Sequence, residues 1–299
     1  MESASVLLQS LANPLSETND EGIETELALG RTLEGGKVID FSSIKASSKA
    51  EQALSSARNQ ICSIEDDVKL LDGEEILGIN QDVIKEVGHD LGKFASAQEI
   101  QDCAAYIRSK APEGLLSQRT EGTNDKQSSS FSAAQIERFE AILADSYKES
   151  GEVTSAFAKT FYLGTQLLPL EARMAIWAIY VWCRRTDEIV DAPRDNDEDM
   201  LLDLASWEMR LENLWKYGDC YDIFDLAMLE IRVKYPNLDI SPFMDMVRGM
   251  LMDVPDLGQE RYERFEELHL YCYRVAGTVG LMSLPVFGCA PGYTDEVAR

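Results

Sequence analysis

Apolar residues recur every three or four positions through much of the second half of the chain, the spacing of helices with one buried face. The repeat begins after Ser132, a suitable N-cap, and Gly151, Pro169 and Pro193 interrupt it. The helices predicted in this way are 132–148, 155–168, 170–190, 199–217, 222–234, 241–253 and 264–286. Runs with a period of two residues joined by hairpin turns are absent from the sequence, so we predict an all-α fold.

Residues 1–130 lack this pattern and are expected to form a divergent, largely flexible leader. A short helix is predicted over 96–107, where Ile100, Ala104 and Ile107 share one side. The polar run 118–130 reads as a linker, so we divide the chain into a leader, 1–130, and a helical domain, 131–299. A tail or adaptor is the simpler interpretation of the leader, and a regulatory or partner-binding segment is the alternative. We expect the helical domain to keep its stability without it.

The helix predicted over 170–190 is apolar on every side and ends in two acids, Asp187 and Asp191. Residues four apart share a helix face, so the two Cβ atoms are expected about 5–6 Å apart and the carboxylates should repel each other. A hard cation such as Mg²⁺ would relieve that repulsion, since it binds carboxylate oxygens and shares itself with substrate phosphates. The alternative is an acidic, solvated helix end.

Composition and charge argue against several classes of partner and location. The chain has 299 residues, 28 Lys and Arg against 53 Asp and Glu, and a formal net charge of −25, which argues against a nucleic-acid partner and a polybasic membrane patch. The six cysteines show no zinc-like spacing, which favours a reducing compartment. We expect no membrane span, because no apolar run approaches about 20 residues. The N-terminus is rich in serine but too acidic for a typical transit peptide.

Three further groups of residues are candidates for chemistry. Arg184 and Arg185 precede the paired acids by about one turn, so at least one guanidinium can reach an anion there, or else pair with a neighbouring acid. Residues 159–161 place a cation, a hydroxyl and an aromatic ring together, although a surface lysine beside a buried Phe is equally simple. In 271–280, aromatic side chains stand beside small residues, a pattern that helix packing also explains.

Three ordered runs, 158–162, 175–191 and 270–282, resemble the squalene/phytoene synthase family of head-to-head prenyl transferases. The resemblance covers about residues 135–299 and does not extend into the leader. It implies an isoprenoid synthase helical fold around a central cavity. It also implies condensation of two geranylgeranyl diphosphates through a cyclopropyl diphosphate to phytoene, with Mg²⁺ or Mn²⁺ and no nicotinamide cofactor. A plastid location and peripheral association with a membrane are further expectations.

The resemblance also assigns roles by position. It implies metal binding by Asp187 and Asp191 and places Tyr271 near the reacting carbons. The residues expected to hold substrate diphosphate are Arg184, Lys159 and Thr160. Those expected to line the prenyl tunnel are Phe161, Tyr180, Val275 and Gly280.

The chain also departs from the family pattern. Glu is expected where Arg248 stands and Arg where Leu251 stands, which puts substrate handling by that helix in question. The family pattern also has a second aspartate-rich motif on a later helix, and the sequence reaches Arg299 before that motif is expected. Asp199 and Asp203 share its spacing but lie on the helix that follows Asp191. We therefore expect a C-terminally truncated synthase that is inactive alone. The alternatives are a squalene or dehydrosqualene synthase, and a non-catalytic relative acting as a scaffold or assembly factor.

Overall fold

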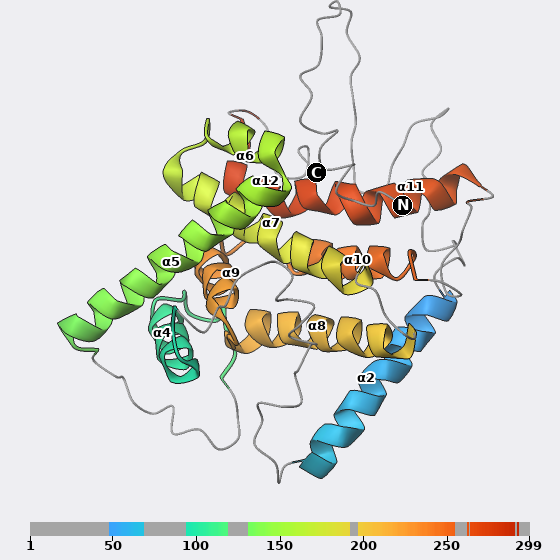
Figure 1. Cartoon of the computed structure of the whole chain (residues 1–299), viewed down its shortest axis with the longest axis horizontal. Coiled ribbons are helices and arrows are strands. Elements are labelled where there is room, and N and C mark those ends of the chain that lie inside the picture. The colour runs from blue at the N-terminus through green and yellow to red at the C-terminus, as the bar shows by residue number, and fades with distance from the viewer. Residues whose placement is uncertain are drawn as a thin grey trace, which may run out of the picture.

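The computed structural model describes residues 48–68, 94–118, 131–191, 197–254, 262, 264–290 and 292. Within these residues the secondary structure is helical and no strand occurs, which confirms the all-α prediction (Figure 1). The elements are α2 (Ser48–Val68), α4 (Ala97–Ser109), α5 (Ala133–Phe157), α6 (Lys159–Thr165), α7 (Leu170–Asp191), α8 (Asp197–Tyr217), α9 (Ile223–Lys234), α10 (Ser241–Met250), α11 (Phe265–Cys272), the π-helix η4 (Tyr273–Gly277) and α12 (Thr278–Phe287).

Helix α7 lies at the centre of the described fold and contacts α5, α8, α9, α10 and α12 (Figure 1). Its Trp182 ring stacks on Trp207 of α8 at 5.9 Å between centroids and meets Phe243 of α10 edge-on at 4.9 Å. All three rings are buried. Aromatic burial is the largest single apolar contribution to such a core, so the central helix predicted from the sequence is confirmed in place and in burial.

Side-chain caps fix where several helices begin. The Ser132 hydroxyl oxygen accepts from the backbone N–H of Gln135, and the Gln135 side-chain oxygen accepts from the backbone N–H of Ser132. The predicted cap of α5 is therefore a complete capping box. Asp222 caps α9 by accepting from the backbone N–H groups of Phe224 and Asp225. The predicted stop at Pro193 lies outside the described residues.

The predicted break at Gly151 is wrong, because α5 continues through it to Phe157. A Cβ at this position would lie 2.8 Å from two ring carbons of Trp177, so glycine permits close packing of α5 on α7. The second predicted helix, 155–168, is correspondingly shorter, since α6 covers Lys159–Thr165.

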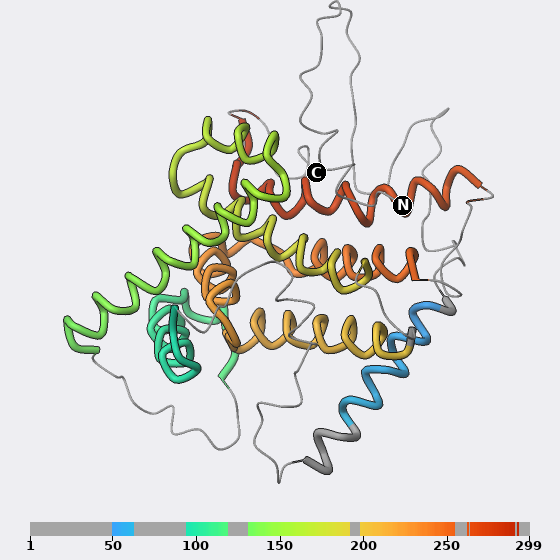
Figure 2. Tube along the Cα trace, in the orientation of Figure 1, coloured from blue at the N-terminus to red at the C-terminus, as the bar shows by residue number. Residues whose placement is uncertain are grey.

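Two helices of the expected leader pack on the later helices. The helix predicted over 96–107 is confirmed as α4, which contacts α5 and α9. Helix α2 was not predicted, yet it contacts α8 and buries Ala50, Leu54, Ala57 and Ile61 on one side (Figure 2). Its stripe is half alanine, which weakens the periodic signal. The described part of the leader is therefore more ordered than expected, while the division at residue 130 stays a prediction.

Helices α11, η4 and α12 form a stretch, Phe265–Phe287, that is long and apolar enough to cross a membrane by length and composition. This differs from the sequence-based expectation that no such run exists. The stretch contacts α7 and α10, and its Arg274 forms an ion pair with Glu51 of α2 at 3.1 Å. Those contacts hold one side of the stretch against the described fold, while 28% of its apolar window is buried.

Candidate functional site

The last two turns of α7 carry the paired acids predicted from the sequence. Asp187 is 6% exposed, whereas Asp191 is exposed at the helix end. Arg184 Nη1 donates to Asp187 Oδ2 at 3.1 Å, and the same guanidinium pairs with Glu188. Burial, and then the neighbouring charge of Asp191, raise the pKa of Asp187 to about 6, against the smaller opposing effect of Arg184. Asp187 is therefore a carboxylate whose negative charge is incompletely neutralised.

A third carboxylate, Asp253, faces this pair from the turn after α10. Its charge contributes to the raised pKa of Asp187. The pKa of Asp253 is itself raised, first by the protein atoms that reduce its hydration and then by Asp191, although a bond from Tyr271 opposes the shift. Tyr271 on α11 donates its hydroxyl to Asp253 Oδ2 at 3.0 Å. The structure thus joins Tyr271 to Asp253, a residue that sequence reasoning missed, and the implied place of Tyr271 near the reacting carbons stays a prediction.

The acids fit a divalent cation that is shared with a substrate. Within the described residues, no group of three or more His, Cys, Asp or Glu side chains is arranged to hold a metal ion. Mg²⁺ is usually bound by one or two carboxylates and completes its shell with waters and substrate phosphate oxygens. Asp187 and Asp191 suit that mode of binding, because a cation there would offset the repulsion that raises the pKa of Asp187.

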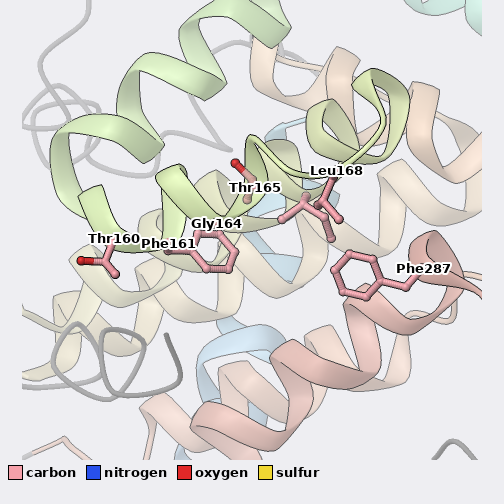
Figure 3. A pocket seen from close by; sticks show the side chains of 7 residues that line it. Thr160, Phe161, Gly164, Thr165, Leu168 and Phe287 are labelled. Atoms are coloured by element: carbon pink, nitrogen blue, oxygen red, sulfur yellow. The ribbon is translucent and has the colours of Figure 1, made fainter. Parts of the chain in front are cut away.

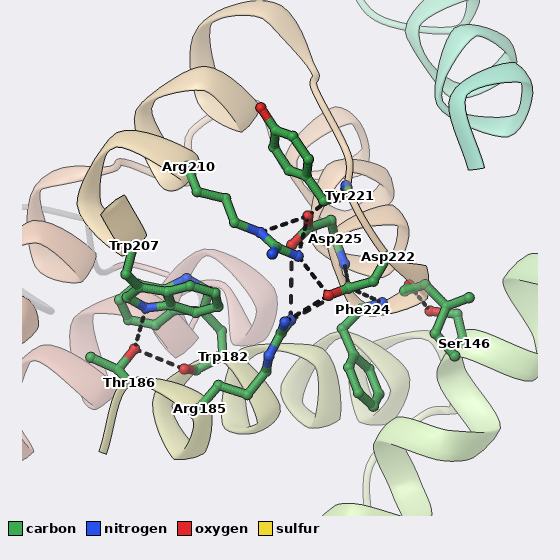
Figure 4. Close-up of polar contacts among 11 residues, drawn as sticks. Ser146, Trp182, Arg185, Thr186, Trp207, Arg210, Tyr221, Asp222, Phe224 and Asp225 are labelled. Atoms are coloured by element: carbon green, nitrogen blue, oxygen red, sulfur yellow. Dashed lines mark hydrogen bonds and ion pairs between the residues drawn. The ribbon is translucent and has the colours of Figure 1, made fainter. Parts of the chain in front are cut away.

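The two adjacent arginines of α7 have different surroundings. Arg184 lies beside Asp187, and its guanidinium also covers the ring of Phe157 at 4.8 Å. Arg185 is buried and donates to Asp222 Oδ2 at 2.6 Å from Nη2 (Figure 4). The sequence allowed either arginine to reach an anion at the acids. The structure places Arg184 beside Asp187 and Arg185 in a separate ion network, and the anion-binding role of Arg184 stays a prediction.

Arg185 belongs to a buried ion network that joins α7, α8 and α9 (Figure 4). Arg210 of α8 donates from Nε to Asp225 at 3.0 Å and from Nη2 to Asp222 at 2.5 Å. Burial alone would raise the pKa of Asp222, but the two guanidinium groups outweigh it and hold that pKa below its usual range. Buried charges persist when paired and hydrogen-bonded, so this network fixes the face of α7 that carries Arg185.

An apolar pocket of about 250 Å³ lies between α6, α7 and α12 (Figure 3). Its lining residues are Thr160, Phe161, Gly164, Thr165, Leu168, Ile176 and Phe287. The Phe161 ring lies 5.6 Å from that of Tyr180, which is one turn before Arg184 on α7. A line of contacts therefore runs from the pocket through Tyr180 towards the acids.

The other predicted site residues are less closely grouped. Lys159 and Thr160 are exposed at the start of α6. A single residue separates this start from Phe157, the last residue of α5, whose ring lies under the Arg184 guanidinium. Val275 is buried against α10, where it would lie 3.0 Å from a Cβ at position 249. Gly280 is exposed and faces open space. Neither Val275 nor Gly280 lines the pocket of Figure 3, so their tunnel roles stay predictions.

Comparison with known proteins points to the same part of the chain. Residues 154–299 match the family model of squalene/phytoene synthase. The chain is 54% identical over 150 residues to phytoene synthase 2, chloroplastic, of Oryza sativa subsp. japonica, covering 50% of this chain and 36% of the relative. It is 53% identical over 148 residues to 15-cis-phytoene synthase of Synechococcus elongatus, covering 50% of this chain and 46% of the relative. For phytoene synthase 1, chloroplastic, of Arabidopsis thaliana, the values are 53% over 152 residues, 50% and 34%. The matched segment thus spans about a third to a half of each relative.

Proposed function

We propose that this protein serves the head-to-head condensation of two geranylgeranyl diphosphates to phytoene, the first step of carotenoid biosynthesis, because residues 154–299 match the family model of squalene/phytoene synthase. The reaction would pass through a cyclopropyl diphosphate and use no nicotinamide reductant. The observation that carries the proposal is the placement of Asp187, which is buried beside Arg184 and faces two further carboxylates.

The roles proposed for the polar residues follow from charge. Loss of diphosphate from an allylic substrate leaves a concentrated negative charge that must be neutralised. A divalent cation, Mg²⁺ or Mn²⁺, held by Asp187 and Asp191 would supply part of that neutralisation. Arg184 would donate to the diphosphate directly once its bond to Asp187 is relaxed. Lys159 and Thr160, at the start of α6, are proposed to hold the same group from the opposite side.

The apolar residues would contain the prenyl chain and the carbocation. Aromatic faces stabilise positive charge, and exclusion of water protects a carbocation from capture. Phe161 and Tyr180 supply adjacent aromatic rings, and the pocket beside them is apolar. We propose that Val275 and Gly280 line the same path, and that Tyr271, fixed by its bond to Asp253, lies near the reacting carbons.

The apolar surface around the pocket favours contact with a membrane, the reservoir expected for so apolar a product. Three leucines stand exposed at α6 and at the start of α7: Leu163 at 58%, Leu167 at 90% and Leu170 at 63%. Phe287 of α12 is 55% exposed and also lines the pocket. The relatives named chloroplastic support a plastid location. We propose peripheral association at this face.

Calorimetry of the chain with geranylgeranyl diphosphate tests the site. We expect binding that requires Mg²⁺ or Mn²⁺ and that is lost in the double variant Asp187→Asn, Asp191→Asn. The matched control is Asp199→Asn, Asp203→Asn, which removes two carboxylates with the same spacing from α8 and should bind as the parent does. Binding that needs no metal, or that survives the first double variant, contradicts the metal assignment.

Product analysis of the same mixtures tests the reaction. Phytoene above a boiled control would support the full activity in this chain. A hydrocarbon formed from farnesyl diphosphate in preference to geranylgeranyl diphosphate would instead favour a squalene-type synthase. Metal-dependent binding without any product would favour the non-catalytic alternative for this chain.

A further inference from the structure

Helix α2 lies outside the residues that match the family, yet it is built into the described fold. The match covers residues 154–299, whereas α2 covers Ser48–Val68. Its apolar side, formed by Ala50, Leu54, Ala57 and Ile61, is buried in the common core. A segment without counterpart in the matched region therefore contributes to the packing of the family segment.

Arg58 anchors α2 to α8. Its guanidinium donates to both carboxylate oxygens of Glu212, at 3.1 and 2.7 Å, and it also pairs with Glu208. Glu208 is 3% exposed, and a buried carboxylate that lost its cation would be strongly destabilising. The position of α2 on α8 is thus specified by a charge requirement of α8 as well as by apolar contact.

One turn from the start of α2, Glu51 reaches the part of the fold that carries the site. Its Oε1 accepts from Arg274 Nη2 at 3.1 Å, across 223 positions of sequence. Arg274 is 9% exposed and lies in η4, three residues before its end and three after Tyr271. The other end of its guanidinium, Nη1, contacts Met252 Sδ at 3.7 Å, directly before Asp253.

Arg274 is therefore linked to both partners of the hydrogen bond between Tyr271 and Asp253. Tyr271 precedes it on α11, and Asp253, which accepts the Tyr271 hydroxyl, follows Met252. Close packing makes this position sensitive, because a Cβ at Gly249 of α10 would stand 2.9 Å from Arg274 Cβ. A small movement of the guanidinium would be transmitted to both sides of the Tyr271–Asp253 bond.

We infer that α2 is a positioning helix for the site: Glu51 holds Arg274, and through it the relative placement of η4 and the turn that carries Asp253. Glu51 acts through Arg274 and touches neither the acids nor Tyr271. The inference uses the site of the proposed function but concerns its geometry, so one of its tests requires no substrate.

The test compares Glu51→Gln with Glu212→Gln in the full chain. Both changes remove one carboxylate from the α2 interface, and the two side chains are similarly exposed, at 42% and 40%. Glu51→Gln breaks the pair with Arg274, whereas Glu212→Gln weakens the Arg58 anchor and leaves Arg274 paired. Glu51 is partly exposed but Arg274 is buried, so we expect the melting temperature of Glu51→Gln to fall somewhat below that of the parent.

Hydrogen–deuterium exchange is the first readout. We expect amides of Tyr273–Gly277 to exchange about three- to tenfold faster in Glu51→Gln than in the parent, the range of coupling carried by contacts along such a network. Amides of α9, Ile223–Lys234, serve as an internal reference and should be unchanged. In Glu212→Gln the exchange of η4 should match that of the parent.

Binding of Mn²⁺ with inorganic pyrophosphate, followed by the electron paramagnetic resonance of free Mn²⁺, is the second readout. We expect a loss of affinity of about three- to tenfold in Glu51→Gln and none in Glu212→Gln. A parent that binds no Mn²⁺ would contradict the proposed function, and the exchange data would still decide the positioning role. If η4 exchanges alike in both variants and the parent, the inference is wrong.

Discussion

Asp187 is held in a place that is unfavourable for a carboxylate in the metal-free protein. It is nearly buried, and its pKa is raised to about 6, first by burial and then by Asp191. A folded-state pKa above the unfolded value means that the contribution of Asp187 to stability is fully present below pH ~4 and is lost as pH rises through about 6. If the proposed cation binds at Asp187, the site would give up stability in the metal-free state in exchange for affinity towards that cation.

This leads to a prediction for Asp187→Asn without added metal. Above pH 6 the variant should unfold at a higher urea concentration than the parent. Its free energy of unfolding should be greater by about 1–3 kcal/mol, since one pKa unit corresponds to about 1.4 kcal/mol. The advantage should vanish below pH 4, where the parent carboxyl is neutral in both states. Added Mn²⁺ should stabilise the parent and not the variant. Asp191→Asn is the control, and a variant less stable than the parent at pH 8 contradicts the assignment.

Sequence reasoning located the acids but could not orient their neighbours. Adjacent helix positions differ by about 100° around the axis. Which of Arg184 and Arg185 faces the acids therefore depends on where α8 and α9 place Trp207, Asp222 and Asp225, and this is a tertiary property. Asp253 was missed for a related reason. It follows its helix as one acid among many, and Tyr271 alone, from a distant helix, distinguishes it.

At the scale of elements, α10 and η4 pack closely beside the turn that carries Asp253. Gly249 allows it, because a Cβ there would lie 2.9 Å from Arg274 Cβ and 3.2 Å from the Arg274 backbone carbon. Backbone atoms cannot turn aside as a flexible side chain can. The two helices would have to separate to admit even a methyl group.

We therefore expect Gly249→Ala to lower the free energy of unfolding by about 1–3 kcal/mol, the usual cost of overpacking. Gly164→Ala is the matched control, since it is also helical and a Cβ there would meet nothing within 4 Å. Alanine is the better helix former by up to about 1 kcal/mol, so the control should be neutral or stabilising. Urea unfolding of both variants measures the difference, and equal effects would refute the packing argument.

Helix positions were predicted well where the apolar stripe is strong, as in α7, and less well where glycine or alanine replaces it. Gly151 predicts a break because the intrinsic helix propensity of glycine is low. The Trp177 ring that fills the space beside it outweighs that preference. The same limitation hid α2, whose buried side is half alanine and whose anchor, Arg58, has its partners on α8.

At the scale of the whole molecule, exposed apolar side chains gather at α6, the start of α7 and the end of α12, around the pocket mouth. The net charge of −25 opposes attraction to an anionic surface, so a membrane contact there must rest on apolar insertion. Leu167, at 90% exposure, is the most exposed of these side chains.

The double variant Leu167→Ser, Leu170→Ser should bind neutral phosphatidylcholine vesicles at least about tenfold more weakly in a flotation assay, since burying one leucine contributes about 1.5–3 kcal/mol. Phe265→Ser is the control, because Phe265 is 69% exposed but lies at the start of α11, away from α6 and the pocket (Figure 1). Equal loss in both variants would show that exposure alone, and not this face, governs the contact.

The π-helix η4 sets the rotation of α12 relative to α11 about their common axis. It inserts a wider turn between α11, which points Tyr271 at Asp253, and α12, whose Met282 sulfur lies 3.7 Å from Cys183 of α7. Removing one residue from this turn would leave a regular helix and rotate α12 by about 100° relative to α11. Tyr271 and Met282 could then not both keep their partners. The π-helical turn therefore allows Tyr271 to contact Asp253 while Met282 contacts Cys183 in the core.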